Sequence, residues 1–180
     1  MRLLFVIDMQ QDFIRGVLGT REAEGIIENV KNKVCSAVEE STPVIFTRDT
    51  HGLDYLDRQE GKLLPYPHCI AGTSGWEIIT ELSEYTNDNN TFDKPTFGSL
   101  NMVLSLYFCQ TDHEPIDSIE LCGVCTDICL ISNALLLKSA FPEIPIFVDA
   151  SCCAGTTPEN HEAALKVMQS CQIKVMNKEA

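Results

Sequence analysis

The segment 121–130, LCGVCTDICL, places Cys122, Cys125 and Cys129 close together along the chain. Thiols at such spacing can bind a metal, pack in a core or act as a nucleophile. A structural zinc site needs a second pair of ligands at matching spacing, and the sequence offers none. This argues against a zinc knuckle and leaves core packing and a reactive cysteine as the alternatives.

The three cysteines are expected to fall on different elements. Cys122 lies inside an apolar run and should pack in the core, whereas Cys125 falls at the turn that follows. Thr126 is a favourable N-cap, and Asp127 suits the first turn of a helix. Cys129 would then lie near the start of that helix, where oriented N–H groups and the dipole lower the pKa of a thiol toward the reactive thiolate. The alternative for Cys129 is a buried core thiol.

A thiol nucleophile needs one group that takes its proton and another that favours its anion. Asp8 follows an apolar run and could accept the proton, then return it to a leaving amine. Burial would raise the pKa of Asp8, and a nearby Lys94 would oppose part of that change. The alternatives are a turn or cap residue for Asp8 and a solvated surface lysine for Lys94.

A second group of residues has the types that bind metals. Asp49 and His51 are two apart, so on extended backbone their side chains point the same way. His68, in PYPHCIAGTSGW, could fold back to join them. Two histidines and a carboxylate suit zinc, iron or manganese. Glu60 is a candidate fourth ligand and otherwise a solvated charge. The spacing alone leaves a metal site and hydrogen-bonded loop residues equally open.

Apolar segments of two kinds must position these residues. Strands are expected at 3–7, 43–47, 90–94, 118–124, 144–150 and 172–176, with 90–94 the weakest. Helical spacing of apolar residues predicts helices at 22–40, 98–108, 126–140 and 158–170. Strands that alternate with helices imply βαβ units, and nearly continuous apolar strands are buried on both faces. We therefore predict an α/β protein, a three-layer α/β/α sandwich with a mostly parallel, six-stranded, Rossmann-like sheet.

The candidate residues follow four different strands. In an open parallel α/β sheet, ligands bind at the carboxyl ends of the strands. Asp8, Asp49, Lys94 and Cys129 would all arrive at that edge, which favours an active site over coincidence. No Gly-x-Gly-x-x-Gly motif follows the first strand, so dinucleotide binding has no support.

Two other histidines and two other cysteines are expected to have structural roles and not to take part in the reaction. His113 and His161 should be exposed or lie on a helix face. Cys152 and Cys153 adjoin the fifth predicted strand and should pack, although they could line the same edge of the sheet.

Length and charge limit the class of protein. The 180 residues suit one domain, 1–180, with a functional excursion around 49–90 that is rich in Gly, Pro and charge. A net charge of −13 disfavours nucleic acid and anionic membranes as partners. No apolar run approaches the length of a membrane span or a signal peptide, and the nine cysteines form no disulfide pattern. We expect a cytoplasmic protein with free thiols.

Three motifs together resemble those of the isochorismatase-like cysteine hydrolase superfamily, over nearly the whole chain. VIDMQQDF resembles the opening motif that supplies a catalytic Asp8, and DKPTFGSL resembles the segment that supplies a catalytic Lys94. GVCTDICL resembles the nucleophile motif, in which Cys129 attacks. By the same resemblance, the N–H groups of Cys125 and Cys129 form the oxyanion hole, and the peptide bond joining Val124 to Cys125 is cis.

Within the superfamily, TRDTH and PHCIAGTSGW resemble the nicotinamidase branch. Those enzymes bind a divalent metal through an Asp, a nearby His and a later His, which match Asp49, His51 and His68. The resemblance therefore implies a divalent metal cofactor, with zinc expected first and iron or manganese as alternatives. An acidic residue completes the set in some nicotinamidases, and Glu60 is the candidate here.

The resemblance implies a metal-containing cysteine amidase that acts on a small aromatic amide. The expected reaction converts nicotinamide to nicotinic acid and ammonia through a thioester. Phe13, Val124 and Cys125 are expected to contact the substrate. Cys125 stands where many nicotinamidases have Ala. The resemblance therefore defines the type of reaction more narrowly than it defines the substrate. The family also implies a homo-oligomer.

Two further alternatives remain open. A sibling hydrolase of the same superfamily would act on another small amide, a carbamoyl compound or a vinyl ether. A catalytically silent member would serve as a binding subunit, although the intact set of Asp8, Lys94 and Cys129 argues against it.

Overall fold

The fold was analysed in a computed structural model that describes residues 1–109 and 115–178. The strands are β1 (Arg2–Ile7), β2 (Val44–Asp49), β3 (Thr91–Lys94), β4 (Ser118–Val124), β5 (Ile146–Ala154) and β6 (Lys174–Met176). The helices are α1 (Gln11–Ile14), α2 (Arg21–Gly25), α3 (Ile27–Glu39), α4 (Gln59–Leu63), α5 (Thr80–Ser83), α6 (Leu100–Cys109), α7 (Ile131–Ala140) and α8 (Pro158–Ser170). A 3-10 turn, η1 (Tyr55–Asp57), and a π-helical turn, η2 (Thr126–Leu130), complete them.

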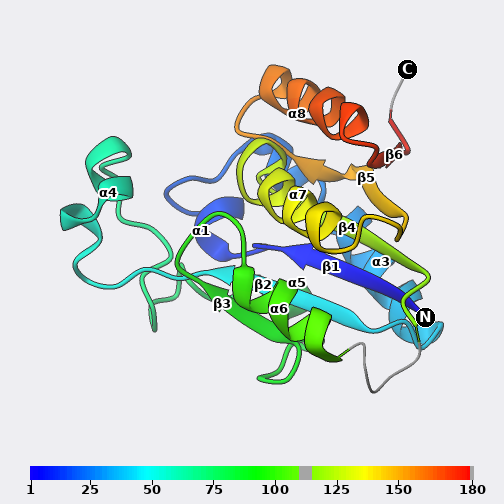
Figure 1. The fold of residues 1–180 in the computed structure, drawn as a ribbon. Helices are drawn as coiled ribbons and strands as arrows, with labels where there is room; N and C mark the ends of the chain where they lie inside the picture. Colours follow the sequence, from blue (N-terminus) through cyan, green and yellow to red (C-terminus); the bar gives the residue numbers. More distant parts are fainter. Residues whose placement is uncertain (110–114, 179–180) are drawn as a thin grey trace.

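The six strands form one sheet in the order β3-β2-β1-β4-β5-β6, and every neighbouring pair is parallel. This is the strand order of a Rossmann-like sheet, whose direction of winding reverses between β1 and β4. Helices α6, α7 and α8 lie in front of the sheet in Figure 1, and α3 lies behind it. The predicted three-layer α/β/α fold is confirmed.

The core lies between the sheet and these two helix layers. The strand β1 is buried along almost its whole length, because helices cover both of its faces. Helix α3 turns Ile27, Val30 and Val34 inward, and α8 begins at Pro158 with Thr157 as an N-cap that accepts from the Asn160 N–H. Within the described ranges, no helix has both the length and the apolar character that crossing a bilayer requires.

The predicted helix 126–140 is divided into η2 and α7, and two other predicted elements also differ from the structure. The predicted helix 22–40 is two helices, α2 and α3, because α2 ends at Gly25 and the chain changes direction at Ile26. The fifth strand runs farther than predicted, so Cys152 and Cys153 lie inside β5 and are buried, as their expected packing role requires. His113 lies outside the described residues.

The excursion between β2 and β3 contains η1, α4 and α5. In Figure 1 the part that carries α4 projects away from the sheet, beyond the carboxyl ends of the strands. It returns to the body at Ile70, which pairs with His51 in an isolated parallel bridge. The excursion is therefore placed to bring residues from 52–69 over the end of β2.

Candidate active site

The carboxyl ends of β1, β2, β3 and β4 carry the residues that the sequence singles out. Asp8 follows β1, Asp49 and Lys94 are the last residues of β2 and β3, and Cys129 lies in η2 after β4. The ends of β1 and β4 flank the point where the sheet reverses its winding, which is the usual ligand crevice of this architecture.

The turn after β4 is shaped by backbone features. Gly123 has φ +114°, and a Cβ at this position would lie 2.2 Å from the Ile7 carbonyl oxygen, so β4 can approach β1 this closely only with glycine. The peptide bond between Val124 and Cys125 is cis, as the resemblance implies. Asp8, at the facing strand end, has φ +49°, a left-handed conformation that Asp tolerates better than most residues.

The start of the following helix differs from the prediction. Residues 126–130 form a π-helical turn with Cys125 as the preceding residue, and Thr126 does not cap it. The Thr126 hydroxyl instead lies 2.8 Å from His161 Nδ1, so His161 is half-buried against this turn and not simply exposed. Asp127 accepts hydrogen bonds from the Thr156 N–H and hydroxyl, which fixes the turn to the segment after β5.

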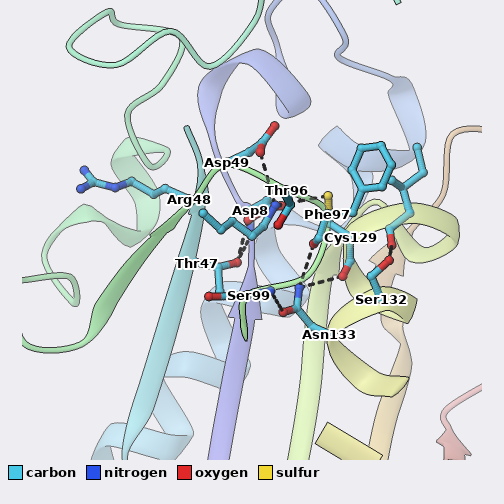
Figure 2. A network of polar contacts seen from close by, with 12 residues as sticks. Asp8, Thr47, Arg48, Asp49, Thr96, Phe97, Ser99, Cys129, Ser132 and Asn133 are labelled. Carbon is cyan, nitrogen blue, oxygen red and sulfur yellow. Dashed lines mark hydrogen bonds and ion pairs between the residues drawn. The ribbon is translucent and has the colours of Figure 1, made fainter. Parts of the chain in front are cut away.

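Lys94 lies at the centre of the first cluster. Its Nζ is 2.6 Å from Asp8 Oδ2, 3.4 Å from Cys129 Sγ and 3.5 Å from Asp49 Oδ1. The Thr47 hydroxyl donates to Asp8 Oδ1 at 2.6 Å (Figure 2), whereas Asp8 Oδ2 has the Lys94 ammonium as its ion-pair partner. Asp8, Lys94 and Cys129 are 0%, 1% and 4% exposed, which makes their mutual interactions strong. The structure therefore brings together the three predicted residues.

The electrostatics of this cluster couple an acid and a thiol. Burial raises the pKa of Asp8, Lys94 opposes the change, and the charge of Asp49 adds to it. Burial also raises the pKa of Cys129 well above its ordinary value, with Asp8 adding to the rise and Lys94 opposing it. The prediction of a lowered thiol pKa was wrong, because removal from water outweighs the turn's N–H groups and the lysine. Cys129 rests as a thiol, so an attack by its sulfur requires that a neighbouring base accept its proton.

The second cluster lies beside the first and shares Asp49 with it. One donor atom from each of Asp49, His51, Glu60 and His68 lies within 4.8 Å of the other three. His51 Nε2 is 2.9 Å from Asp49 Oδ2, and His68 Nε2 is 3.5 Å from the same oxygen. Glu60 Oε1 lies 3.7 Å from both histidine nitrogens. The excursion thus brings all four predicted residues together.

These residues fit a divalent metal ion. His68 Nδ1 donates to the Tyr66 carbonyl oxygen at 2.8 Å, which leaves its Nε2 facing the cluster, as in metal-bound histidines. Burial and the charge of Asp49 raise the pKa of Glu60, so the two carboxylates repel each other in the absence of a cation. Two imidazole nitrogens and two carboxylate oxygens suit zinc, iron or manganese.

Burial alone would raise the pKa of Asp49. The hydrogen bonds from His51 and His68, together with the charge of Lys94, instead lower it below its usual range. Asp49 therefore stays ionised and links the two clusters electrostatically.

Sequence reasoning missed Gln10, which holds the backbone of Asp49. Its side-chain amide donates to the Asp49 carbonyl oxygen at 2.9 Å and accepts from the Asp49 N–H at 2.6 Å. It also donates to the Trp76 carbonyl oxygen at 2.8 Å, and the whole residue is buried. Gln10 therefore fixes a candidate ligand to the returning end of the excursion. A glutamine three residues after the end of β1 was the one available signal.

Aromatic rings surround the histidines. The Tyr55 ring centroid is 4.8 Å from that of His51 and 5.1 Å from that of His68, so η1 packs onto the candidate ligands. Phe13, predicted to contact the substrate, is buried, and its ring centroid lies 5.5 Å from that of His68.

The other predicted pocket residues, Val124 and Cys125, immediately precede η2, the turn that carries Cys129. Val124 is fully buried, and Cys125 is partly exposed. Burial raises the pKa of Cys125 to about 12, so its thiol stays protonated. Cys122 is fully buried, and its thiol points to the Phe5 carbonyl oxygen at 3.7 Å, which agrees with a packing role.

An α/β/α fold with an acid, an amine and a thiol gathered where the sheet reverses is typical of the isochorismatase-like class of hydrolases. The family model described as an isochorismatase domain matches residues 2–180. The chain belongs to the isochorismatase family and is a hydrolase of that family.

Proteins from several organisms are similar to the chain. An uncharacterized isochorismatase family protein, PncA of Bacillus subtilis (strain 168), is 27% identical over 174 residues, which are 91% of this chain and 92% of that protein. The crystal structure of the pyrazinamidase/nicotinamidase of Streptococcus mutans UA159 is 27% identical and covers 98% of this chain and 100% of its own, with a TM-score of 0.79. The pyrazinamidase of Pyrococcus horikoshii in complex with zinc shares the fold at 22% identity, with 98% and 99% of the chains covered and a TM-score of 0.78.

Proposed function

We propose that the protein is a metal-containing cysteine amidase that converts nicotinamide to nicotinic acid and ammonia. The observation that carries the proposal is that Lys94 joins the two clusters, with Nζ at 3.4 Å from Cys129 Sγ and 3.5 Å from Asp49 Oδ1. A nucleophile and a site suited to a metal are thereby held next to each other. The similarity to nicotinamidase structures at about a quarter identity supports the choice of substrate.

The first half of the reaction follows from the resting state of the thiol. As the sulfur of Cys129 attacks the amide carbon, its proton passes to Asp8, whose pKa is raised by burial, which makes the carboxylate a stronger base than an exposed one. Negative charge then develops on the carbonyl oxygen, and the N–H groups of Cys125 and Cys129 are the proposed donors to it. Each such donor is typically worth about 3 kcal/mol of barrier.

The second half returns the protein to its starting state. Asp8 gives its proton to the leaving nitrogen, the C–N bond breaks, and ammonia departs from a thioester on Cys129. A water molecule then attacks the thioester carbon, and Asp8 takes a proton from that water. The C–S bond breaks and nicotinic acid is released. Asp8 returns its proton to the Cys129 sulfur, which restores the thiol. Lys94 keeps its charge throughout, because although burial opposes that charge, Asp8, Cys129 and Asp49 together raise its pKa.

The metal's proposed role is to bind the substrate. An ion held by Asp49, His51, His68 and Glu60 would bind the pyridine nitrogen and orient the amide toward Cys129. Zinc is the first expectation because it favours imidazole and carboxylate ligands with a position left open. Phe13 and Tyr55 would contact the aromatic ring, since both already pack against the ligand histidines.

The experiment is a deamidation assay on purified protein with its metal content measured. The proposal predicts ammonia and nicotinic acid in equal amounts and about one bound metal per chain. Ammonia from other small amides but not from nicotinamide would support the sibling hydrolase instead. No turnover of any amide, carbamoyl compound or vinyl ether would support a silent binding subunit.

We also propose that the protein assembles into a homo-oligomer. The excursion exposes Leu53 (95%) and Leu63 (79%), and α6 exposes Leu100 and Leu104. Large apolar side chains that are exposed to solvent are candidates for burial between copies of the chain. Sedimentation of the purified protein tests this, and a monomer at all concentrations would contradict it.

A further inference from the structure

Asn133 is a fully buried polar residue on α7, next to Ser132. Its Nδ2 donates to the Cys129 carbonyl oxygen at 2.8 Å and to the Phe97 carbonyl oxygen at 3.2 Å. Its Oδ1 accepts from the Ser99 N–H at 2.9 Å. One side chain therefore forms hydrogen bonds with both η2, the turn that carries Cys129, and the segment 95–99 that follows β3 (Figure 2).

The sheet does not join the segment after β3 directly to the turn after β4. Lys94 ends β3, an edge strand of four residues that pairs only with β2 in the described sheet. Cys129 follows β4, and both β2 and β1 stand between β4 and β3. The ladder of backbone hydrogen bonds therefore fixes the Lys94–Cys129 distance only through two intervening strands.

Gly98 packs against Ser132 and Leu136 of α7, and Asn133 adds a direct hydrogen-bonded connection between the two segments. Phe97 lies three residues after Lys94, and Cys129 lies one helical turn before Asn133. The amide uses both of its N–H groups and its oxygen in this position, so its orientation is fully determined. A buried amide with all of these bonds made rigidifies the groups it joins.

We propose that Asn133 is a positioning residue that holds the Lys94 segment against the Cys129 turn and so sets the 3.4 Å contact between Nζ and Sγ. This inference rests on the proposed function for its catalytic consequence, but the contact itself can be tested without any substrate. Displacement of a catalytic group by about 1 Å can cost on the order of 100-fold in rate.

The test compares Asn133→Leu with Ser132→Ala. Leucine keeps a similar volume but removes the bonds to both segments. Ser132 is a matched control, because its hydroxyl donates to the Ile128 carbonyl oxygen at 2.6 Å, and alanine keeps the Cβ that faces Gly98 and leaves all the bonds of Asn133 in place. Thermal unfolding of both variants would establish that they fold.

The readout that separates positioning from general stability is the reactivity of Cys129. Alkylation by iodoacetamide, followed by mass spectrometry of the peptide that contains Cys129, gives its rate as a function of pH. The groups that act on this thiol are Asp8, Lys94, Asp49 and Cys125, of which Lys94 alone favours the thiolate. Movement of Lys94 away should therefore shift the alkylation profile of Asn133→Leu to higher pH, while Ser132→Ala keeps the wild-type profile.

If nicotinamide is a substrate, kcat of Asn133→Leu should fall by about 10- to 100-fold with KM changed far less. An Asn133→Leu alkylation profile that matches the wild type would overturn the inference, as would an equal shift in Ser132→Ala. If nicotinamide is not hydrolysed by the wild type, the proposed function fails, while the alkylation result still decides the role of Asn133.

Discussion

The Lys94 ammonium lies 2.6 Å from Asp8 Oδ2, and both side chains are almost completely buried. Removal of one partner from a buried ion pair leaves the other charge without compensation, which typically costs about 3–5 kcal/mol. Lys94→Met should therefore lower the free energy of unfolding by about this amount at pH 8, measured by urea denaturation. Arg58→Met is the control, because its ion pair with Asp54 is exposed and contributes about 1 kcal/mol at most.

The cost of Lys94→Met should depend on pH. The pKa of Asp8 is already raised by burial, and loss of the lysine raises it further. A carboxyl whose pKa is higher in the folded than in the unfolded state stabilises the fold at low pH and loses that contribution as pH rises through the folded-state pKa. The destabilisation should thus be smaller at pH 5 than at pH 8. An equal loss at both pH values would contradict the assigned pairing.

The acid side of the activity profile should report Asp8. Its ionised form must accept the Cys129 proton, and burial raises its pKa above the ordinary 3.8. We expect kcat/KM for nicotinamide to fall with decreasing pH at a midpoint above that value. The assay needs saturating metal, because protons compete with the metal for His68. A fall in kcat/KM with its midpoint at or below pH 3.8 would argue against Asp8 as the base.

The metal cluster predicts a graded response to substitution. His68→Ala removes a buried candidate ligand and should abolish stoichiometric zinc binding, measured by titration calorimetry. Glu60→Gln should weaken binding but leave it measurable, since Glu60 is half-buried and 3.7 Å from the histidine nitrogens. Wild-type protein that binds no divalent metal would contradict the assignment of the whole cluster.

Gln10→Leu tests the support of Asp49 from outside the ligand set. Loss of a residue that orients a metal ligand typically lowers metal affinity by about 10- to 100-fold. We expect a zinc dissociation constant raised by that factor, with Gln59→Ala on exposed α4 unchanged. Equal zinc affinities of Gln10→Leu and the wild type would show that the hydrogen bonds of Gln10 do not contribute to metal binding.

The residues that the sequence could identify are those that follow strands. Asp8, Asp49 and Lys94 are placed by their own strand ends, and parallel strands deliver their carboxyl ends to one edge of a sheet. The position of each could therefore be predicted from local pattern and one rule of architecture.

The residues that the sequence could not identify act through contacts between distant segments. Thr47, Gln10 and Asn133 each form bonds with residues that are between 34 and 66 positions away, and no local pattern encodes those pairings. The distant partners of Asn133 were therefore not predictable from its place in the helix. The raised pKa of Cys129 was also missed, because it depends on how deeply the turn is buried.

If Cys129 is the nucleophile, Cys129→Ala should lose the release of ammonia from nicotinamide. The matched control is Cys125→Ala, which removes the neighbouring thiol of the same turn and should keep much of the activity. We predict that Cys129→Ala releases no ammonia above the buffer rate while it still folds and binds metal. Ammonia release by Cys129→Ala at a rate close to the wild type would contradict the account.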